Sequence, residues 1–568
     1  PRPGTVAVLP FRTAGATPDL GYLREGLVDL LAMNLTGEVG PRAADPRTVF
    51  SAWRRLAGSV GAELSRDSAM AVARVVGADA AIMGAVVGST TRLTLSASLV
   101  VGAGSGEATS ARVSGPPDSL PVLVERLAGI LLSLDSGQDP RDMAPLAETP
   151  LPALRSYLQG VAAYRRGEFD DAVDHFRFAL EIDSTFASAA FGIELAAPWS
   201  LRVDERERGQ RIAWRYRDRL SPLDRLHLAS RSGPDYPEPP TLDELLEVRE
   251  RAVEVMPDRA EVWYELGDLY FHWGRILGEE DWQELALQGF DKALELDPDF
   301  AAPIHHSTML AAMRRDTAAV RALGSRLEGT SATFGRWMEA HVVGDTAEIR
   351  RLRRAFDTEP PELLVWIVGA ADHSLGLSPE DARAAATILA GMPRTPTQKR
   401  IHILTARAVE LNAGRPADAL RWLDAYAEIA DDPDHSSRLA ITDALYAGGD
   451  SARAEAAARH LESAAPPDSL TGLENRCLAA EWRLWHGHSL TDDALPARAR
   501  AAAGEARGFG RSQLAVCAGT VEALAAPPGP ARDAALDRLD SLLLRGPFTG
   551  FVNLGGPYHG NLAVSRLR

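Results

Sequence analysis

The sequence predicts a mainly α-helical protein in which a solenoid of helical repeats follows a small α+β sandwich domain. Two observations predict the solenoid. A pair of amphipathic helices joined by a tight turn occupies residues 153–186, and a second copy of the pattern occupies residues 261–300. A third observation predicts the α+β domain, because short apolar runs and one alternation of apolar with polar residues lie between residues 5 and 113.

The α+β domain is expected to cover residues 1–134. Four segments carry the apolar stripe or the polar caps of helices, and they lie at residues 22–36, 47–56, 65–76 and 118–132. Four segments are apolar or alternate as strands do, and they lie at residues 5–11, 80–87, 92–101 and 107–113. A strand, three helices, three strands and a last helix, in that order, predict helices packed on a sheet.

Residues 135–152 are rich in Pro, Asp, Ser and Gly and are expected to be a linker. The helical repeats then span residues 153–300, with a degenerate segment at 197–240. Within this segment SPLDRLHLAS is expected to be a short capped helix, and the four prolines of GPDYPEPP exclude a helix after it. Degenerate repeats are expected to continue over residues 301–568. Their clearest helix pairs are expected around Gly414, around Gly448, at residues 475–488 with 492–508 and at 512–524 with 531–545, before the first helix of another repeat at 558–568.

Small residues occupy positions in both well-formed hairpins where two helices would touch. Gly160 and Gly267 are such positions, Gly167 supplies the first turn, and the second turn, at residues 275–282, is longer. The spacing of a small residue, an aromatic and an alanine resembles the tetratricopeptide repeat, a unit of about 34 residues. The resemblance implies stacked helix pairs whose inner helices line a concave groove.

The segments VAVLPF, GLVDLLAMNL, ARVVGADAAIMGAVV and LTLSASLV resemble a domain related to the TolB amino-terminal domain, which precedes tetratricopeptide repeats in bacterial signalling proteins. Those proteins carry a serine/threonine kinase, a nucleotide cyclase or a winged-helix regulator at their other end. The resemblance covers residues 5–132 and continues through the repeats, and its motifs are packing motifs that imply no catalytic residue. We therefore expect part of a longer polypeptide, since the chain begins at Pro1 without methionine.

The net charge of −17 argues against a nucleic-acid-binding protein, which needs a basic stripe, and against attachment to an anionic membrane surface. No apolar run approaches the roughly 20 residues that span a bilayer, so direct insertion of this segment is not expected. A missing upstream helix could still tether the region. The side of the membrane stays open, with the extracytoplasmic side of a bacterial inner membrane favoured over the cytoplasm.

The chain lacks the motifs of the common enzyme classes, including phosphate-binding loops, zinc helices and kinase signatures. Residues 102–106 (GAGSG) follow a strand, as a dinucleotide-binding loop would. A strand rather than a helix is expected next, so a hairpin turn is favoured. An enzyme with an unrecognised site is the least favoured interpretation, and no cofactor is expected.

Neither the histidines nor the cysteines predict a metal site. The histidine pair that begins at His305 and the pair that flanks Gly487 lack an evident third ligand, so packing or exposure is expected. The two cysteines, Cys477 and Cys517, lie on separate expected helices of the C-terminal region and could meet. Buried free thiols are the expectation.

The sequence therefore favours a non-enzymatic interaction or sensor region of a larger bacterial signalling protein, which binds a protein or peptide partner in the concave groove. The alternative is a permanent structural subunit or assembly scaffold, whose interface would bury about 2,000 Å² or more of apolar surface. The tetratricopeptide resemblance implies which residues face the groove between the first hairpin and the second. The partner-binding residues expected on this basis are Tyr157, Tyr164, Arg165, Tyr264, Asp268, Phe271 and His272.

Overall fold

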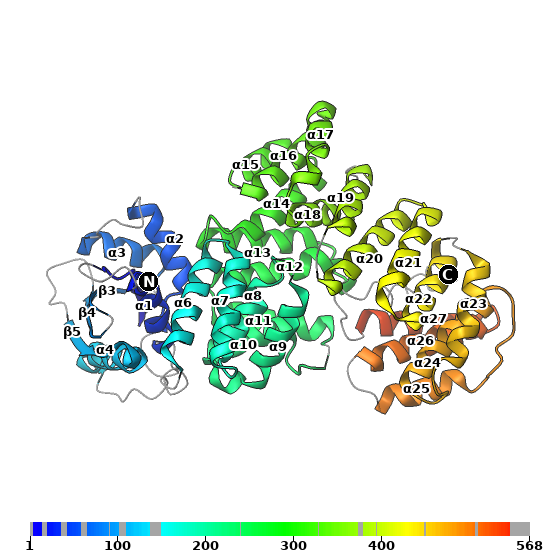
Figure 1. The fold of residues 1–568 in the computed structure, drawn as a ribbon, viewed down its shortest axis with the longest axis horizontal. Coiled ribbons are helices and arrows are strands. Elements are labelled where there is room, and N and C mark those ends of the chain that lie inside the picture. Colours follow the sequence, from blue (N-terminus) through cyan, green and yellow to red (C-terminus); the bar gives the residue numbers. More distant parts are fainter. Residues whose placement is uncertain are drawn as a thin grey trace. The chain divides into compact units, whose positions relative to one another are not determined.

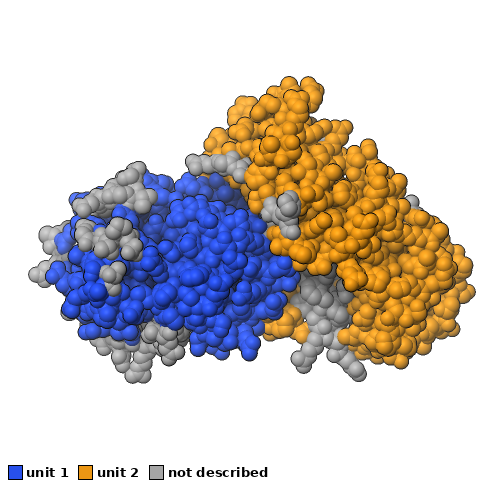
Figure 2. Space-filling view, in the orientation of Figure 1, with its two compact units in different colours: residues 1–231, 248–271, 283–306 blue, residues 232–247, 272–282, 307–568 orange. Residues whose placement is uncertain are grey.

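The structure is a computed structural model that describes residues 4–13, 20–35, 42–57, 65–89, 91–101, 109–136, 149–200, 202–238, 240–327, 329–372, 379–392, 395–447, 450–505 and 509–545. The chain divides into two compact units (Figure 2). The first unit contains residues 1–231, 248–271 and 283–306, and the second contains residues 232–247, 272–282 and 307–568. The expected fold class is confirmed, because helical hairpins follow a small sheet covered by helices (Figure 1).

The sheet has five strands in the order β2-β1-β3-β4-β5. Their bounds are β1 Thr5–Val8, β2 Arg42–Ala43, β3 Ala80–Gly88, β4 Leu93–Val101 and β5 Thr109–Gly115. Strand β1 pairs in parallel with β2 and β3, and β3, β4 and β5 are antiparallel. The glycine loop at residues 102–106 lies outside the described residues, but the antiparallel pairing of β4 with β5 is what a hairpin requires.

Helices cover both faces of the sheet. Their bounds are α1 Leu23–Asn34, α2 Pro46–Ala57, α3 Arg66–Val75 and α4 Leu120–Ser136. The apolar side chains of α1 and α4 pack with the inward residues of β4, whereas those of α2 and α3 pack on the other face, against β1 and Val100. Ser65 caps α3 as expected, since its hydroxyl accepts a hydrogen bond from the backbone N–H of Ser68. Strand β2 was not predicted, because two residues are too few to show alternation.

Helical hairpins follow in the first unit and continue into the second. The helices from residue 151 to residue 313 are α6 Leu151–Arg165, α7 Phe169–Ile182, α8 Ala187–Ala196, α9 Val203–Arg215, α10 Pro222–Ser232, α11 Leu242–Val255, α12 Ala260–Leu277, α13 Trp282–Leu296 and α14 Ala301–Met313. Gly167 has φ +77° in the turn between α6 and α7, as the sequence predicts. The turn expected at residues 275–282 is shorter than predicted, because α12 continues to Leu277.

Close approach of α12 and α13 depends on Gly267. A Cβ atom at this position would lie 2.8 Å from the carbonyl oxygen of Ala286 and 2.9 Å from the ring of Phe290. A Cβ on Gly289 would in turn lie 2.8 Å from the Cα of Gly267. The sequence prediction that two helices touch at Gly267 is confirmed.

The second unit continues with helical hairpins. Its helices are α15 Thr317–Gly324, α16 Gly329–Val343, α17 Thr346–Arg353, α18 Pro361–Asp372, α19 Pro379–Gly391, α20 Pro396–Asn412, α21 Pro416–Ala430, α22 Pro433–Ala447, α23 Ser451–Ser463, α24 Leu470–Trp485, α25 Leu495–Glu505, α26 Phe509–Ala525 and α27 Pro530–Arg545. The expected helix pairs around Gly414, at residues 475–508 and at 512–545 are present. The glycines at 448–449 and the helix expected at 558–568 lie outside the described residues.

The expectation of free thiols is wrong. Cys477 on α24 and Cys517 on α26 are paired as a disulfide, with Cα atoms 5.7 Å apart. Adjacent packing of α24 against α26 brings the two cysteines together, although α25 lies between these helices in the sequence. In the described residues, no helix is both long enough and apolar enough to cross a bilayer.

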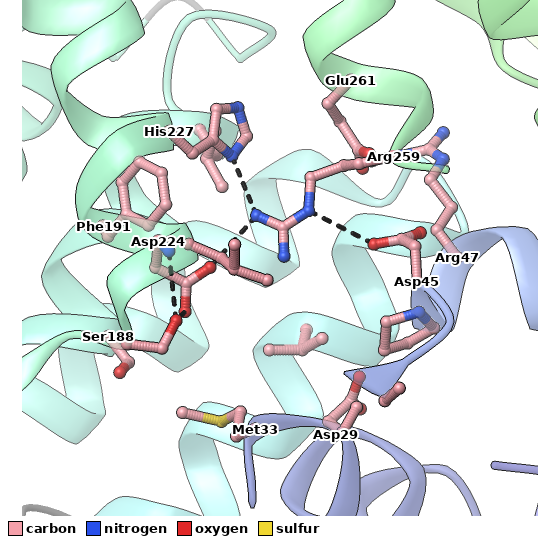
Figure 3. A pocket seen from close by; sticks show the side chains of 18 of the residues that line it. Asp29, Met33, Asp45, Arg47, Ser188, Phe191, Asp224, His227, Arg259 and Glu261 are labelled. Atoms are coloured by element: carbon pink, nitrogen blue, oxygen red, sulfur yellow. Dashed lines mark hydrogen bonds and ion pairs between the residues drawn. The ribbon is translucent and has the colours of Figure 1, made fainter. Parts of the chain in front are cut away.

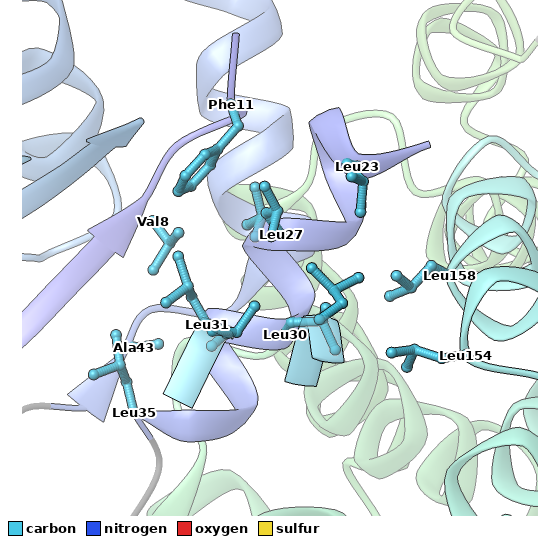
Figure 4. Close-up of a cluster of buried hydrophobic side chains, with 14 of the residues drawn as sticks. Val8, Phe11, Leu23, Leu27, Leu30, Leu31, Leu35, Ala43, Leu154 and Leu158 are labelled. Atoms are coloured by element: carbon cyan, nitrogen blue, oxygen red, sulfur yellow. The ribbon is translucent and has the colours of Figure 1, made fainter. Parts of the chain in front are cut away.

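The α+β domain and the first hairpin share one hydrophobic core (Figure 4). The leucine stripe of α1 faces the sheet through Leu27 and Leu31, while Leu30 lies toward Leu154 and Leu158 of α6. Gly26 permits this contact, because a Cβ atom there would lie only 2.7 Å from Cδ1 of Leu158. The first unit therefore fixes the α+β domain against the beginning of the repeats.

Candidate functional site

Charged side chains join the α+β domain to the repeats around a cavity in the first unit. Four arginines form these links, each with one or more carboxylates. Their partners are Glu25 and Asp29 for Arg165, Asp258 for Arg42, Glu261 and Asp297 for Arg47, and Asp45 and Asp224 for Arg259. Because most of these groups are largely buried, each needs its partner to offset the loss of hydration.

The start of α2 is built into this network. Asp45 caps α2 by accepting a hydrogen bond from the backbone N–H of Thr48 at 3.1 Å. The carboxylate of Asp258, which precedes α12, accepts a bond from the backbone N–H of Asp45 at 3.1 Å. The hydroxyl of Thr48 donates to the carbonyl oxygen of Asp258 at 2.9 Å. A helix cap of one domain is thus held by the loop that begins a repeat of the other.

A cavity of about 170 Å³ lies among these groups (Figure 3). Its walls come from α1, the β2–α2 segment, α6 to α8, α10 and the start of α12. Asp29 and Met33 approach it from α1, Arg259 crosses it toward His227 and Asp45, and Phe191 closes another side. Since a water molecule occupies about 30 Å³ in the liquid, the cavity has room for several waters or a small organic group.

Burial shifts the acidity of the groups around the cavity in different directions. Burial raises the pKa of Asp45 to about 7, the carboxylates of Glu261 and Asp258 add to the increase, and Arg259 opposes it. Burial also raises the pKa of Asp29, although Arg165 opposes this shift. Burial opposes ionisation of Glu265 as well, but the charges of His227 and Arg231 prevail and lower its pKa to about 2. The network therefore contains carboxyl groups that hold their protons unusually tightly.

His227, which lines the cavity, contacts charged side chains through both of its ring nitrogens. Nε2 of His227 lies 2.8 Å from Oε1 of Glu265, and Nδ1 lies 3.4 Å from Nη1 of Arg259. Ser221 donates its hydroxyl hydrogen to Asp224 at 2.8 Å. Ser221 thus bonds to a carboxylate of the network, as His227 does.

Three of the residues expected in the groove line this cavity. Tyr157 packs between Phe176 and Phe186, with ring centroids 5.9 and 5.0 Å away. The guanidinium of Arg47 lies 5.8 Å from the ring centroid of Tyr164. Arg165 donates to Asp29 Oδ1 at 2.6 Å and to Glu25 Oε2 at 3.0 Å. Tyr157, Tyr164 and Arg165 thus meet the chain's own α+β domain and the core of the hairpin.

The other expected residues lie along α12, outside the cavity lining. Tyr264 donates its hydroxyl hydrogen to Asp268 at 3.3 Å, and its ring meets that of His306 at 5.6 Å. Phe271 is buried and meets His306 edge-on, with centroids 4.9 Å apart. His272 is half-buried one turn after Asp268. The structure therefore divides the expected set between the cavity and an aromatic cluster around His306, whose Nε2 also lies 3.3 Å from Oδ1 of Asp268.

Sequence reasoning missed the cavity residues of the α+β domain and of the loop before α12. They are Asp29, Arg42, Asp45, Asp258 and Arg259. One signal was present, because Asp29 interrupts the apolar segment GLVDLLAM, where a charged residue needs a partner or a function. The other four residues have partners more than 200 residues away in the sequence, so no local sequence pattern indicates that they form a site.

Neither a protein-family model nor a curated protein matches this chain. Among solved structures, the chain is similar to YrrB, described as a tetratricopeptide-repeat protein with an unusual peptide-binding site, at 16% identity and TM-score 0.19, over 36% of this chain and 92% of that one. It is also similar to yeast Tom70, at 11% identity and TM-score 0.20, over 73% and 88% of the two chains. The human IFIT1 dimer with PPP-AAAA matches at 12% identity and TM-score 0.27, over 49% and 64%.

Proposed function

We propose that this chain is a non-enzymatic sensor or interaction region of a larger bacterial signalling protein, and that the cavity between its α+β domain and its first repeats is the binding site. The supporting observation is that α1 and α2 on one side, and α6, α8, α10 and α12 on the other, wall a single cavity. A molecule bound there would contact both parts. Binding would then stabilise their association, since a ligand favours the arrangement that it contacts.

The same geometry favours a small ligand, or one side chain of a protein partner, over an extended peptide. The tetratricopeptide resemblance implies that an extended peptide would run past Arg165 and Tyr164. Helix α1 already contacts Arg165, and α2 contacts Tyr164. A peptide along this groove would have to displace Asp29 and Arg47 from buried ion pairs. Breaking one such pair typically costs about 3–5 kcal/mol.

The permanent-subunit alternative predicts a wide apolar surface. Large exposed apolar side chains of the first unit's described residues lie singly or in pairs on different elements, such as Val122 on α4 and Phe178 on α7. Scattered residues of this kind are normal on a protein surface. The cavity is the more specific feature, and we therefore favour the sensor function.

Thermal unfolding with a panel of small amines, carboxylates, amino acids and sugars tests the proposal. Val161→Trp would fill the cavity from α6, and Val122→Trp, the same exchange at an exposed position of α4, is the matched control. We expect at least one compound to raise the melting temperature of the wild-type chain and of the control, but not of Val161→Trp. If no compound does so, or if Val161→Trp responds equally, the cavity is not a binding site.

A further inference from the structure

Asp29 lines the cavity with a carboxylate that is only half satisfied by hydrogen bonds. It is only 6% exposed, and one of its carboxylate oxygens, Oδ1, accepts a hydrogen bond from Arg165. The other oxygen, Oδ2, is buried without a hydrogen-bond partner among the described residues, and Oε2 of Glu261 is in the same state. Both residues line the cavity (Figure 3). An unpartnered buried acceptor is costly, so a ligand that donates hydrogen bonds to these two oxygens would offset that cost.

The charges around the cavity are unbalanced in the same sense. Four arginines and five carboxyl groups line the cavity. Burial raises the pKa values of Asp29 and Asp45, because a poorly hydrated site disfavours the charged carboxylate, and neighbouring carboxylates add to both shifts. A positive charge in the cavity would therefore be attracted by the carboxyl groups that line it.

The cavity is less suited to an anionic ligand. Binding a carboxylate or phosphate usually requires a guanidinium with two N–H groups available in a fork. Arg165, Arg47 and Arg259 each direct their guanidinium at two carboxylates. Arg42 donates to Asp258 and to the carbonyl oxygen of Val255, and only its single Nε–H is buried without a partner.

The remaining wall suits an alkyl chain. Met33, Val161 and Leu195 contribute apolar side chains to the lining, and Tyr157 and Tyr164 contribute aromatic rings. Aromatic faces also attract organic cations. A ligand with a charged head and a short apolar stem would thus match both kinds of surface.

We propose that the cavity binds a small organic cation, an alkylammonium or alkylguanidinium group, whose N–H groups donate to Oδ2 of Asp29 while its stem packs on Tyr157, Val161 and Leu195. This inference rests on the proposed function and adds the ligand class. The same chemistry is offered by a free amine and by the side chain of a lysine or arginine in a partner. We favour the free form, because a cavity of about 170 Å³ has room for a small organic group.

Isothermal titration calorimetry with n-butylammonium, n-butanol and butyrate tests the proposal, since these probes share a stem and differ in the head group. We expect n-butylammonium to bind at least tenfold more tightly than the other two. Asp29→Asn keeps a hydrogen-bond acceptor for Arg165 but removes the charge of the carboxylate. It should weaken the binding of n-butylammonium at least tenfold. Glu25→Gln alters the other partner of Arg165 without changing the cavity wall, and should have less than a threefold effect.

The outcomes separate this inference from the proposed function. Equal binding of n-butylammonium to Asp29→Asn and wild type, or tighter binding of butyrate or n-butanol, would overturn the cation proposal while leaving the cavity a binding site. Failure of every probe, together with a null result in the thermal panel, would overturn both. A capped lysine peptide that binds Asp29-dependently where n-butylammonium does not would also overturn the free-amine form and assign the site to a basic partner side chain.

Discussion

Arg47 and Asp297 form an ion pair across 250 residues of sequence, with Nε of Arg47 donating to Oδ2 of Asp297 at 2.6 Å. Arg47 lies in the first turn of α2 in the α+β domain, whereas Asp297 directly follows α13, where the second well-formed hairpin ends. The same guanidinium lies 4.0 Å from the ring centroid of Phe300. One side chain therefore connects the first domain to the end of a repeat.

Replacing Arg47 should destabilise the first unit strongly. Arg47→Met would leave Asp297, whose side chain is 3% exposed, as a buried carboxylate without this cation, at an expected cost of about 3–5 kcal/mol. Urea unfolding at pH 7 measures the loss. Arg54→Met is the control on the same helix, because its pair with Asp299 is 4.0 Å long and exposed, and it should cost less than about 1 kcal/mol. Similar losses in the two variants would contradict the central role of Arg47.

Gly267 should be intolerant of a large side chain. Gly267→Leu would force α12 away from the carbonyl of Ala286 and the ring of Phe290, at an expected cost of about 1–3 kcal/mol. Hydrogen exchange should rise in α12 and α13 and in the hairpins next to them, because repeats stabilise their neighbours. Gly391→Leu, at the end of α19 with open space around its Cα, should change exchange little. Unchanged exchange in α12 and α13 of the Gly267 variant would rule out this contact.

Asp45 should make stability depend on pH. The folded chain holds the Asp45 proton up to about pH 7, while an unfolded chain releases it near the ordinary pKa of 3.8. Folding therefore takes up a proton between these values, and the free energy of unfolding contributed by Asp45 falls as the pH rises from about 4 to about 7. Glu261, Asp258, Arg259 and Thr48 are the groups that face it.

Asp45→Asn should remove this dependence, since asparagine also caps a helix. Urea unfolding at intervals from pH 4 to pH 8 is expected to show a flatter profile than that of the wild-type chain. Asp67→Asn, at an exposed position in the first turn of α3, should leave the wild-type profile unchanged. A steeper fall in the Asp45 variant would mean that the carboxyl group is ionised throughout.

The pair Cys477 and Cys517 should stabilise the second unit. The disulfide closes a loop of 40 residues, for which about 2–4 kcal/mol of stabilisation is typical. Cys477→Ser should lower the midpoint of urea unfolding, and hydrogen exchange should rise in α24 and α26. Thiol titration of the denatured, unreduced wild-type chain should find no reactive thiol at these positions, and two thiols per chain would contradict the pairing.

Local patterns were sufficient to predict most elements of the fold. Ser65 marked the start of α3, Gly167 and Gly414 marked turns with positive φ, and Gly267 marked a helix contact, because each depends on a few neighbouring residues. The tetratricopeptide resemblance also directed attention to Tyr157 and Tyr164, which line the cavity.

The rest of the site depends on how the α+β domain packs on the repeats, and no local pattern records that packing. The local sequence does not show why residue 26 is a glycine, because the contact that requires it is made by Leu158 of α6. Nothing in the local sequence distinguishes Arg42 and Asp258 from other charged residues. They form a pair only because the fold brings together side chains that are 216 residues apart. The tetratricopeptide resemblance implied an open groove, and the structure instead places α1 and α2 against part of it.

Hydrogen exchange of the intact chain with and without n-butylammonium tests most directly whether the cavity is a binding site shared by both parts. The account predicts slower exchange on both walls, in α1 and the start of α2 and also in α6 and the start of α12, and no such protection in Val161→Trp. Protection confined to one wall, or equal protection in Val161→Trp, would contradict it.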